Sequence, residues 1–412
     1  MTDAEQTRRF RRFAAAGISF QGGSAAVDSS TMIAALVYGL TGNAFAVGAT
    51  SATLRFGWLF PQLLVAYLAQ QRRQRMPFYI LGAFGRATCL ALLAIMLGSA
   101  AMMPTGLTIG LFFVLWVAYS FISGIVAVPY NDIIARSIVS EHRSRLLALR
   151  FFGGGLLALA VAAFAYQLID TLPTLTAYAA VIGIGAVLMY ASSFLFVSAG
   201  EPEAPLSPWQ DEGFRTFIQR GIEIFRTDHR FRFFVFVQWC GGVVMMALPF
   251  YVIQATDLNM SPSHVALLLA AQTIGALLSN TLWGWWGDHR GKRHLLEGIA
   301  LLRVAPPVMI LSLTHGLTSG SELILPSFIV IFFILGGLMN GTTIATIGYL
   351  MEISPNDRRP AYSGYFNAIV APASLLPLAG AAMVQWWSLS AVFMLSLAAA
   401  LLQFYMVRRL AR

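Results

Sequence analysis

Two charged residues lie inside long apolar stretches, and they are the first candidates for chemistry. Asp28 lies near the centre of the first stretch and Arg55 near the centre of the second. A charge at the centre of a membrane-spanning helix costs at least about 2.5–3.5 kcal/mol on insertion scales, so such residues usually have a function. A carboxyl group that is neutral when desolvated and ionised in water can couple a movement to protons. We expect Asp28 and Arg55 to act in proton coupling or substrate contact. A static ion pair that only fixes packing is the other interpretation.

The composition indicates a membrane protein that must position these charges on helices. Of 412 residues, 58% are hydrophobic and 11% are charged, whereas a soluble domain has about 25% charged residues. Apolar runs of about 20 residues, enough to span a bilayer, recur along the chain. The sequence predicts an all-α membrane protein with twelve transmembrane helices. Their expected spans are residues 16–40, 44–70, 77–101, 106–129, 146–169, 174–198, 231–256, 262–286, 294–315, 323–350, 361–384 and 386–407.

The basic residues predict the orientation of these helices. Arg and Lys gather in alternate loops, a pattern typical of cytoplasmic loops. We therefore expect both termini to be cytoplasmic, in a bacterial inner membrane. Residues 199–230 interrupt the apolar pattern, and Phe214 to Phe225 have the spacing of an amphipathic helix on the membrane surface. The expected organisation is a bundle over residues 1–198, a cytoplasmic linker over 199–230 and a second bundle over 231–412.

A short loop past the middle of the chain carries the most specific motif. Gly284, Asp288, Gly291, Lys292 and Arg293 stand at fixed spacing between two apolar runs. This loop resembles the one between the second and third helices of each half of the major facilitator superfamily. The first half departs from the family pattern, because it has Gln70 in place of the acid. The resemblance implies two pseudo-symmetric six-helix bundles, with a cytoplasmic gating motif that Arg143 and Arg145 complete.

The resemblance also implies which helices line a central cavity. On them, the candidate substrate contacts are Gln21, Tyr38, Trp116, Tyr119, Gln238, Trp239 and Asn340. Such side chains suit a bulky amphiphilic organic molecule, although packing or lipid contact is the other interpretation. Gly337 and Gly341 form a G-x-x-x-G pattern that predicts close helix packing.

Arg86 and Arg303 occupy equivalent places in the two halves. We expect both to lie at the periphery and to reach the cytoplasmic surface or to pair with Asp132 or Glu352. Arg150 is expected to belong with the nearby loop arginines, Arg143 and Arg145.

Taken together, these features predict a secondary active transporter of a small amphiphilic organic molecule that works by alternating access. Proton-coupled efflux is the first hypothesis. Proton-coupled uptake of a metabolite and a non-transporting assembly or lipid-handling factor are the others. No phosphate-binding loop and no metal-ligand spacing occurs in the sequence, so we expect neither an enzyme nor a cofactor. The expected partners are the lipid bilayer, a small-molecule substrate and protons, with no nucleic acid, and the chain is expected to be a monomer.

Overall fold

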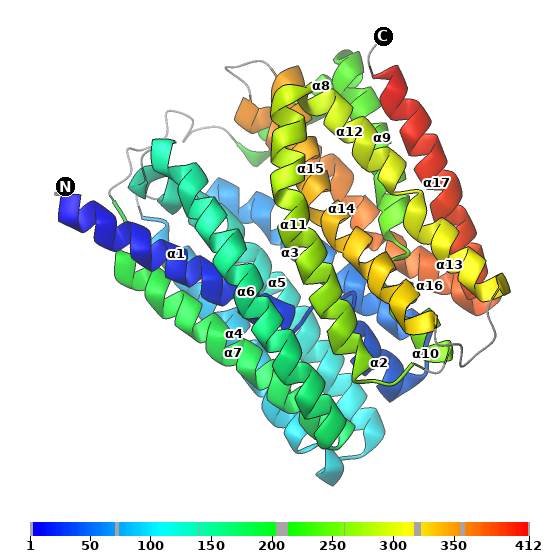
Figure 1. Cartoon of the computed structure of the whole chain (residues 1–412). Helices are drawn as coiled ribbons and strands as arrows, with labels where there is room; N and C mark the ends of the chain where they lie inside the picture. The colour runs from blue at the N-terminus through cyan, green and yellow to red at the C-terminus, as the bar shows by residue number, and fades with distance from the viewer. Residues whose placement is uncertain are drawn as a thin grey trace. The chain divides into compact units, whose positions relative to one another are not determined.

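The structure, a computed structural model, describes residues 3–70, 74–138, 140–202, 213–258, 260–316, 323–354 and 359–410. These residues form helices and no strand (Figure 1). The chain divides into two compact units, which are described separately. The first consists of Met1–Leu36 and Thr53–Glu212, and the second of Val37–Ala52 and Gly213–Arg412.

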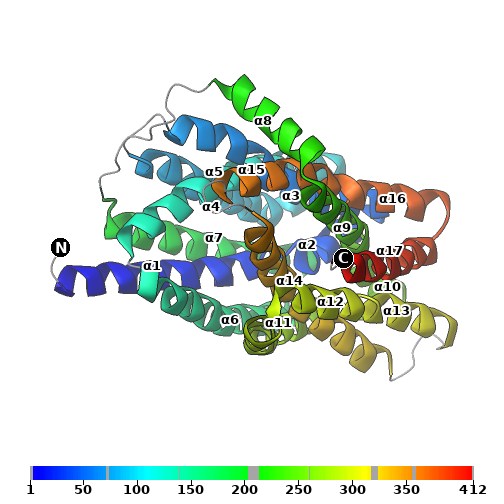
Figure 2. The ribbon, with the colours of Figure 1, turned by 90° about the horizontal axis from the view of Figure 1, so that it is seen from above.

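The first unit is built around a long N-terminal helix. Its helices are α1 (Asp3–Ala25), α4 (Met76–Gly98), the short η1 (Ala100–Met102), α5 (Thr105–Ser137), α6 (Ser140–Thr171) and α7 (Thr174–Ala199). Helix α1 packs against α6 and α7, and α4 packs against α5 and α7 (Figure 2). Glycines permit the close approach of α1, since a Cβ atom at Gly22 would lie 2.6 Å from Leu157 and one at Gly23 would lie 3.0 Å from the carbonyl oxygen of Gly185.

Two helices contribute to both units. Helix α2 (Met32–Thr41) and helix α3 (Ala44–Gln70) each begin in one unit and end in the other. The segment Val37–Ala52, which joins them, belongs to the second unit. It packs there at Gly48, where a Cβ atom would lie 2.6 Å from both Ala381 and the carbonyl oxygen of Pro377.

After Val37–Ala52, the second unit continues with the amphipathic helix that the sequence predicts, α8 (Phe214–Thr227). The helices that follow it in the chain are α9 (His229–Met245), α10 (Leu248–Asp257), α11 (His264–His289), α12 (Gly291–Leu302), α13 (Ala305–Gly316), α14 (Ile324–Ile353), α15 (Arg359–Val370), η2 (Ala371–Leu375), α16 (Leu376–Trp386) and α17 (Leu389–Arg409). Helices α11 and α14 form the most extensive pair (Figure 1). A core of large side chains, including Phe231, Phe234 and Trp283, lies among α9, α11, α12 and α14.

Four expected helices are interrupted, and the prediction of unbroken spans was wrong at these places. The expected span 16–40 starts earlier, at Asp3, and breaks between Ala25 and Met32. The other three breaks separate α9 from α10, α12 from α13, and α15 from α16. Each of these lies next to prolines, which have no N–H to donate to the preceding turn.

Ten helical stretches in the described part of the chain are long and apolar enough to cross a membrane. Met32–Thr41 is a shorter apolar helix that follows the break in the first expected span. The chain is therefore an integral, multi-pass membrane protein, in agreement with its composition.

Candidate functional site

Asp28 lies at the break between α1 and α2, and its carboxylate holds the start of α2. Its Oδ1 atom accepts hydrogen bonds from the backbone N–H groups of Ser30 and Thr31, each at 3.0 Å. The same atom accepts hydrogen bonds from the side-chain hydroxyls of Ser30 and Thr31, at 2.6 and 2.9 Å. This is the arrangement of an N-cap, and it places a negative charge at the positive end of the helix. Within the described residues nothing donates to Oδ2, and the side chain is partly exposed.

Arg55 lies on α3, in the part of that helix that belongs to the first unit. It is close enough to Asp28 for electrostatic attraction. Among the described residues, however, no ion pair or hydrogen bond joins the two side chains. A static ion pair would require such a contact.

A second group of charges surrounds the ring of Phe20, on α1. The Cζ atoms of Arg86 (α4) and Arg150 (α6) lie 4.5 and 5.4 Å from the centre of that ring. Arg150 also donates through Nη1 to the hydroxyl of Tyr130 on α5, at 2.9 Å. A guanidinium over an aromatic face gains about 2 kcal/mol when both are desolvated. We call Phe20, Arg86, Tyr130 and Arg150 the arginine cluster.

Arg86 is buried in this cluster without a hydrogen bond. Its side chain is 5% exposed, and it forms no hydrogen bond or ion pair within the described residues. The groups that act on it electrostatically are Tyr79, Tyr119, Tyr130 and Arg150. The expectation that Arg86 pairs with Asp132 was wrong, because Arg86 points toward α1 while Asp132 is engaged by other arginines.

Arg303, the counterpart of Arg86 in the second unit, has polar partners instead. It is 3% exposed and follows the last residue of α12. Its Nη1 and Nη2 atoms donate to Gln403 at 2.7 Å and to Thr342 at 2.8 Å. The expected pairing with Glu352 was therefore also wrong. The guanidinium borders a small cavity whose other walls include Val244, Met245, Tyr251, Pro306 and Leu338.

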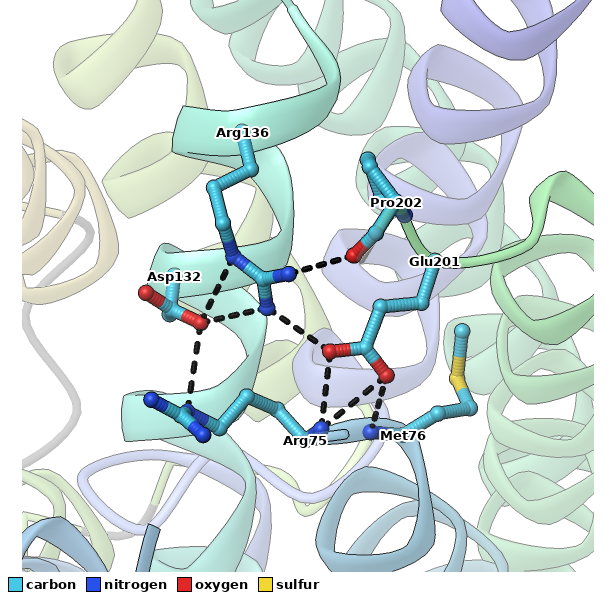
Figure 3. A network of polar contacts seen from close by, with 6 residues as sticks. All are labelled: Arg75, Met76, Asp132, Arg136, Glu201 and Pro202. Atoms are coloured by element: carbon cyan, nitrogen blue, oxygen red, sulfur yellow. Dashed lines mark hydrogen bonds and ion pairs between the residues drawn. The ribbon is translucent and has the colours of Figure 1, made fainter. Parts of the chain in front are cut away.

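Three helix ends of the first unit meet in a charged network (Figure 3). Glu201, just after α7, accepts the backbone N–H groups of Arg75 and Met76 at the start of α4, each at 2.7 Å. It also accepts Nη2 of Arg136, at the end of α5, at 2.7 Å. Asp132 accepts Nε and Nη2 of Arg136 at 3.0 and 2.5 Å, and lies 3.4 Å from Nε of Arg75. We call these residues the helix-end network.

The network fixes the charge of Arg136. Burial by itself lowers the pKa of this guanidinium, but the hydrogen bonds to Glu201 and Asp132 outweigh burial and raise the pKa above its ordinary value. Arg136 therefore stays charged at every physiological pH. The two carboxylates, in turn, keep the ends of α4, α5 and α7 together.

The motif loop of the second half is more helical than predicted. Helix α11 continues to His289, so Gly284 and Gly287 lie inside a helix and not in a turn. Only Gly291 needs the freedom of glycine, because its φ angle is +84° where α12 begins. The aliphatic part of Lys292 lies against Gly348, where a Cβ atom would be 2.9 Å away, and Nε of Arg293 is buried without a partner.

The side chains of Gln70, Arg143, Arg145 and Asp288 lie outside the described part of the chain. A contact of Asp288 with Arg143 or Arg145 therefore stays a prediction.

The same fold occurs in solved membrane transporters. The structure of the nucleoside transporter NupG has a TM-score of 0.73 and 13% identity, over 98% of this chain and 100% of that chain. An auto-inhibited peptide transporter of the POT family has a TM-score of 0.71 and 11% identity, over 98% and 96%. A bacterial homologue of the iron transporter ferroportin, in its inward-facing state, has a TM-score of 0.67 and 12% identity, over 98% of both chains. No curated protein matches the sequence.

A family profile adds a sequence match to this structural one. The profile of the Major Facilitator Superfamily matches residues 241–411. Over these residues the chain is similar in sequence to that superfamily. Its fold is thus the predicted one, twelve transmembrane helices in two six-helix bundles. In this superfamily fold α1 with α2, α9 with α10, α12 with α13, and α15 with α16 each count as one broken transmembrane helix.

In this major facilitator fold, three of the expected cavity residues lie in the first unit. Gln21 packs against α6, where a Cβ atom added at Gly154 would lie 2.5 Å from the Cβ atom of Gln21. Trp116 is fully buried, and its ring lies 5.2 Å from that of Tyr119. Tyr119 in turn faces Arg86, so one predicted contact joins the arginine cluster.

The other four expected cavity residues lie in the second unit. Tyr38, at the end of α2, donates its hydroxyl to Asp257 at the end of α10, at 3.0 Å. Asn340 donates to the carbonyl oxygen of Ala276 at 3.3 Å, Gln238 is buried, and Trp239 packs against the core. The last three positions thus fit packing roles in this conformation.

Sequence reasoning missed the partners of the charges more often than the charges themselves. Arg150 stands beside two loop arginines in the sequence, but its side chain lies with Phe20 and Tyr130. Glu201 reads as the start of a linker, but its side chain is only 7% exposed and holds the helix-end network. A lone acid directly after an apolar helix was the one signal that pointed to it.

Proposed function

We propose that this membrane protein is a secondary active transporter, which moves a small amphiphilic organic molecule by alternating access and couples that movement to protons through Asp28. The observation that carries the proposal is the position of Asp28. It is an acid at a break in the first transmembrane helix, and the residues that the structure describes hold only one of its oxygens.

Protonation of Asp28 would change the helix that follows it. The ionised carboxylate caps α2 and attracts Arg55. A neutral carboxyl loses the attraction to Arg55 and part of the favourable interaction with the helix dipole. The interaction of a charge with the end of a helix contributes about 0.3–1 kcal/mol, which is enough to shift a balanced two-state equilibrium up to several-fold. Proton binding and the position of α2 are thereby linked.

Export is the direction that we propose. The adaptable side chain of Met245, which borders the small cavity beside Arg303, suits a bulky amphiphilic molecule. Uptake would use the same elements with the opposite gradient. A non-transporting assembly factor would need Asp28 only as a helix cap.

Proteoliposomes with trapped pyranine, a pH-sensitive dye, test the proposal. A library of small organic acids, bases and neutral compounds is added, and proton movement is followed by fluorescence. At least one compound should move protons with the wild-type chain and fail to do so with Asp28→Asn or with empty liposomes. If the wild-type protein is folded and none of the compounds causes proton movement, the proposal is contradicted and the assembly factor is favoured.

A further inference from the structure

We propose that Arg86 and Arg150 bind an oxyanion, and that this oxyanion is the charged group of the transported molecule. The substrate class is then an amphiphilic organic acid, ionised as a carboxylate, sulfonate or phosphate ester. The assignment of the substrate rests on the proposed transport function, whereas the oxyanion site itself does not.

The first reason is the number of unfilled hydrogen-bond donors. Each guanidinium carries five N–H donors. Within the described residues Arg86 uses none of them, although its side chain is only 5% exposed. Arg150 has one hydrogen-bond partner among the described residues, the hydroxyl of Tyr130, and its buried Nε has none there. Buried charges are normally hydrogen-bonded and paired, so these donors indicate a missing acceptor.

The second reason is the lack of a counter-charge. The two guanidiniums repel one another, and no carboxylate acts on Arg86. The acids of the first unit whose side chains the structure describes all lie elsewhere. Glu5 pairs with Arg9, Asp28 caps α2, Asp132 and Glu201 hold the helix-end network, and Asp170 is exposed at the far end of α6 from Arg150. The net positive charge of the cluster thus has no described compensation.

The internal repeat supplies a comparison for Arg86. Arg303 occupies the equivalent place in the second half, is equally buried and also lacks a carboxylate. Gln403 and Thr342 accept two of its hydrogen bonds, so the protein itself supplies acceptors for both Nη atoms of a buried arginine at this place, although its Nε has no described partner. Arg86 has aromatic neighbours where Arg303 has these acceptors. In the first unit, the donors of Arg86 therefore remain available to an acceptor from outside the described chain.

The chemistry of the cluster sets the kind of ligand. Guanidinium groups match the geometry of carboxylate, sulfonate and phosphate oxygens, and the Tyr130 hydroxyl lies beside them. The rings of Phe20, Tyr79 and Tyr119 offer an apolar surface next to the charges. An oxyanion on an apolar body uses both features. Since α1, α4, α5 and α6 all contribute side chains, a bound oxyanion would also tie these four helices together.

Thermal unfolding of the purified full-length protein, followed by tryptophan fluorescence, tests the site. The probes are benzenesulfonate, its neutral analogue benzenesulfonamide, and inorganic phosphate, with sodium chloride at equal ionic strength as the reference. Benzenesulfonate should raise the unfolding midpoint by a few degrees, and phosphate by less, because a ligand stabilises only the state it binds. Benzenesulfonamide should leave the midpoint at its chloride value.

Variants assign the effect to the cluster. Arg86→Gln and Arg150→Gln should each abolish the shift with benzenesulfonate. Arg215→Gln removes the same charge from an exposed position on α8 and should retain the shift. If Arg86→Gln does not fold, Tyr130→Phe, which removes only a hydroxyl, should still reduce the shift. No shift in the wild type, or equal shifts in the wild type and both cluster variants (an adventitious ion only), would overturn the site.

Nanodiscs separate a lipid phosphate from a soluble oxyanion. In one outcome, phosphatidylglycerol stabilises the protein more than phosphatidylcholine does, this difference requires Arg86, and neither benzenesulfonate nor phosphate has an effect. That outcome would overturn the substrate assignment. Proton movement with neutral compounds only, and no oxyanion binding, would overturn this inference and leave the transport function standing. Arg86-dependent oxyanion binding without any proton movement would support the site and count against the transport function.

Discussion

Asp28 combines a structural contact with a titratable charge, and substitutions can separate the two. Its Oδ1 atom holds the turn that leads into α2 through four hydrogen bonds from Ser30 and Thr31. An asparagine side chain offers a similar acceptor without the charge, whereas alanine offers none. Asp28→Asn therefore removes the charge and keeps the cap, whereas Asp28→Ala removes both.

Asp28→Ala should lower the free energy of unfolding by about 0.5–2 kcal/mol, because α2 loses its cap. Asp28→Asn should change it by less. Reversible unfolding in mixed micelles of the two variants and the wild type measures both values. Equal losses for the two substitutions would mean that the charge, and not the cap, stabilises the break.

Glu201 is expected to be the most costly acid to remove from the helix-end network. Glu201→Ala leaves the N–H groups at the start of α4 without their acceptor and removes one of the two carboxylates that bind Arg136, and leaving such donors unsatisfied costs about 1–3 kcal/mol. Glu223→Ala, at an exposed position on α8, is the matched control and should stay within about 0.5 kcal/mol of the wild type. Unfolding midpoints compare the two. Similar midpoints would show that the network contributes little to stability.

At the scale of elements, the apolar runs predict the helices well and their interruptions poorly. Helix α3 has the bounds that the sequence predicts, 44–70, although it contains Pro61. The first span breaks at Asp28, whose carboxylate accepts the backbone N–H groups of Ser30 and Thr31 in place of helical carbonyl groups. Such local competition is visible in the sequence only as a cluster of cap-forming residues.

Helices α11 and α14 approach most closely at Gly336, next to the predicted G-x-x-x-G pattern. A Cβ atom there would lie 1.8 Å from the carbonyl oxygen of Gln272, whereas one at Gly337 would lie 3.4 Å from Ser279. Gly336→Ala should therefore destabilise the protein by about 1–3 kcal/mol or more, since backbone must move. Gly337→Ala should be nearly neutral. The expression level and the unfolding midpoint are measured for the Gly336→Ala and Gly337→Ala variants. Equal values for the two variants would refute the close packing at Gly336.

The turn between α11 and α12 gives a second glycine pair. Gly291→Ala forces a side chain into a left-handed conformation and should cost about 1–2 kcal/mol. Gly284→Ala lies inside α11 with open space around it and should be neutral or slightly stabilising. The unfolding midpoints of the Gly291→Ala and Gly284→Ala variants, compared with that of the wild type, measure the two effects. A greater loss at Gly284 would mean that its role lies in a conformation other than this one.

At the scale of the whole molecule, sequence reasoning finds the charges of the candidate site but not their surroundings. Asp28, Arg55 and Arg86 stand out because each interrupts an apolar run. The contact of Arg86 and Arg150 with Phe20 joins three helices that are far apart in the chain, and no local pattern predicts it. The superfamily fold, in contrast, follows from the number and spacing of apolar runs together with one loop motif.

The central claim is that Asp28 couples transport to protons, and one comparison tests it most directly. For a compound identified in the pyranine assay, gradient-driven accumulation and substrate exchange without a gradient are measured for the wild type, Asp28→Asn, and Asp28→Asn with Arg55→Gln. We predict that both variants lose accumulation while Asp28→Asn keeps exchange. Accumulation by either variant at the wild-type level would contradict the claim. Accumulation restored only in the double variant would indicate a structural pairing of Asp28 with Arg55 instead of coupling.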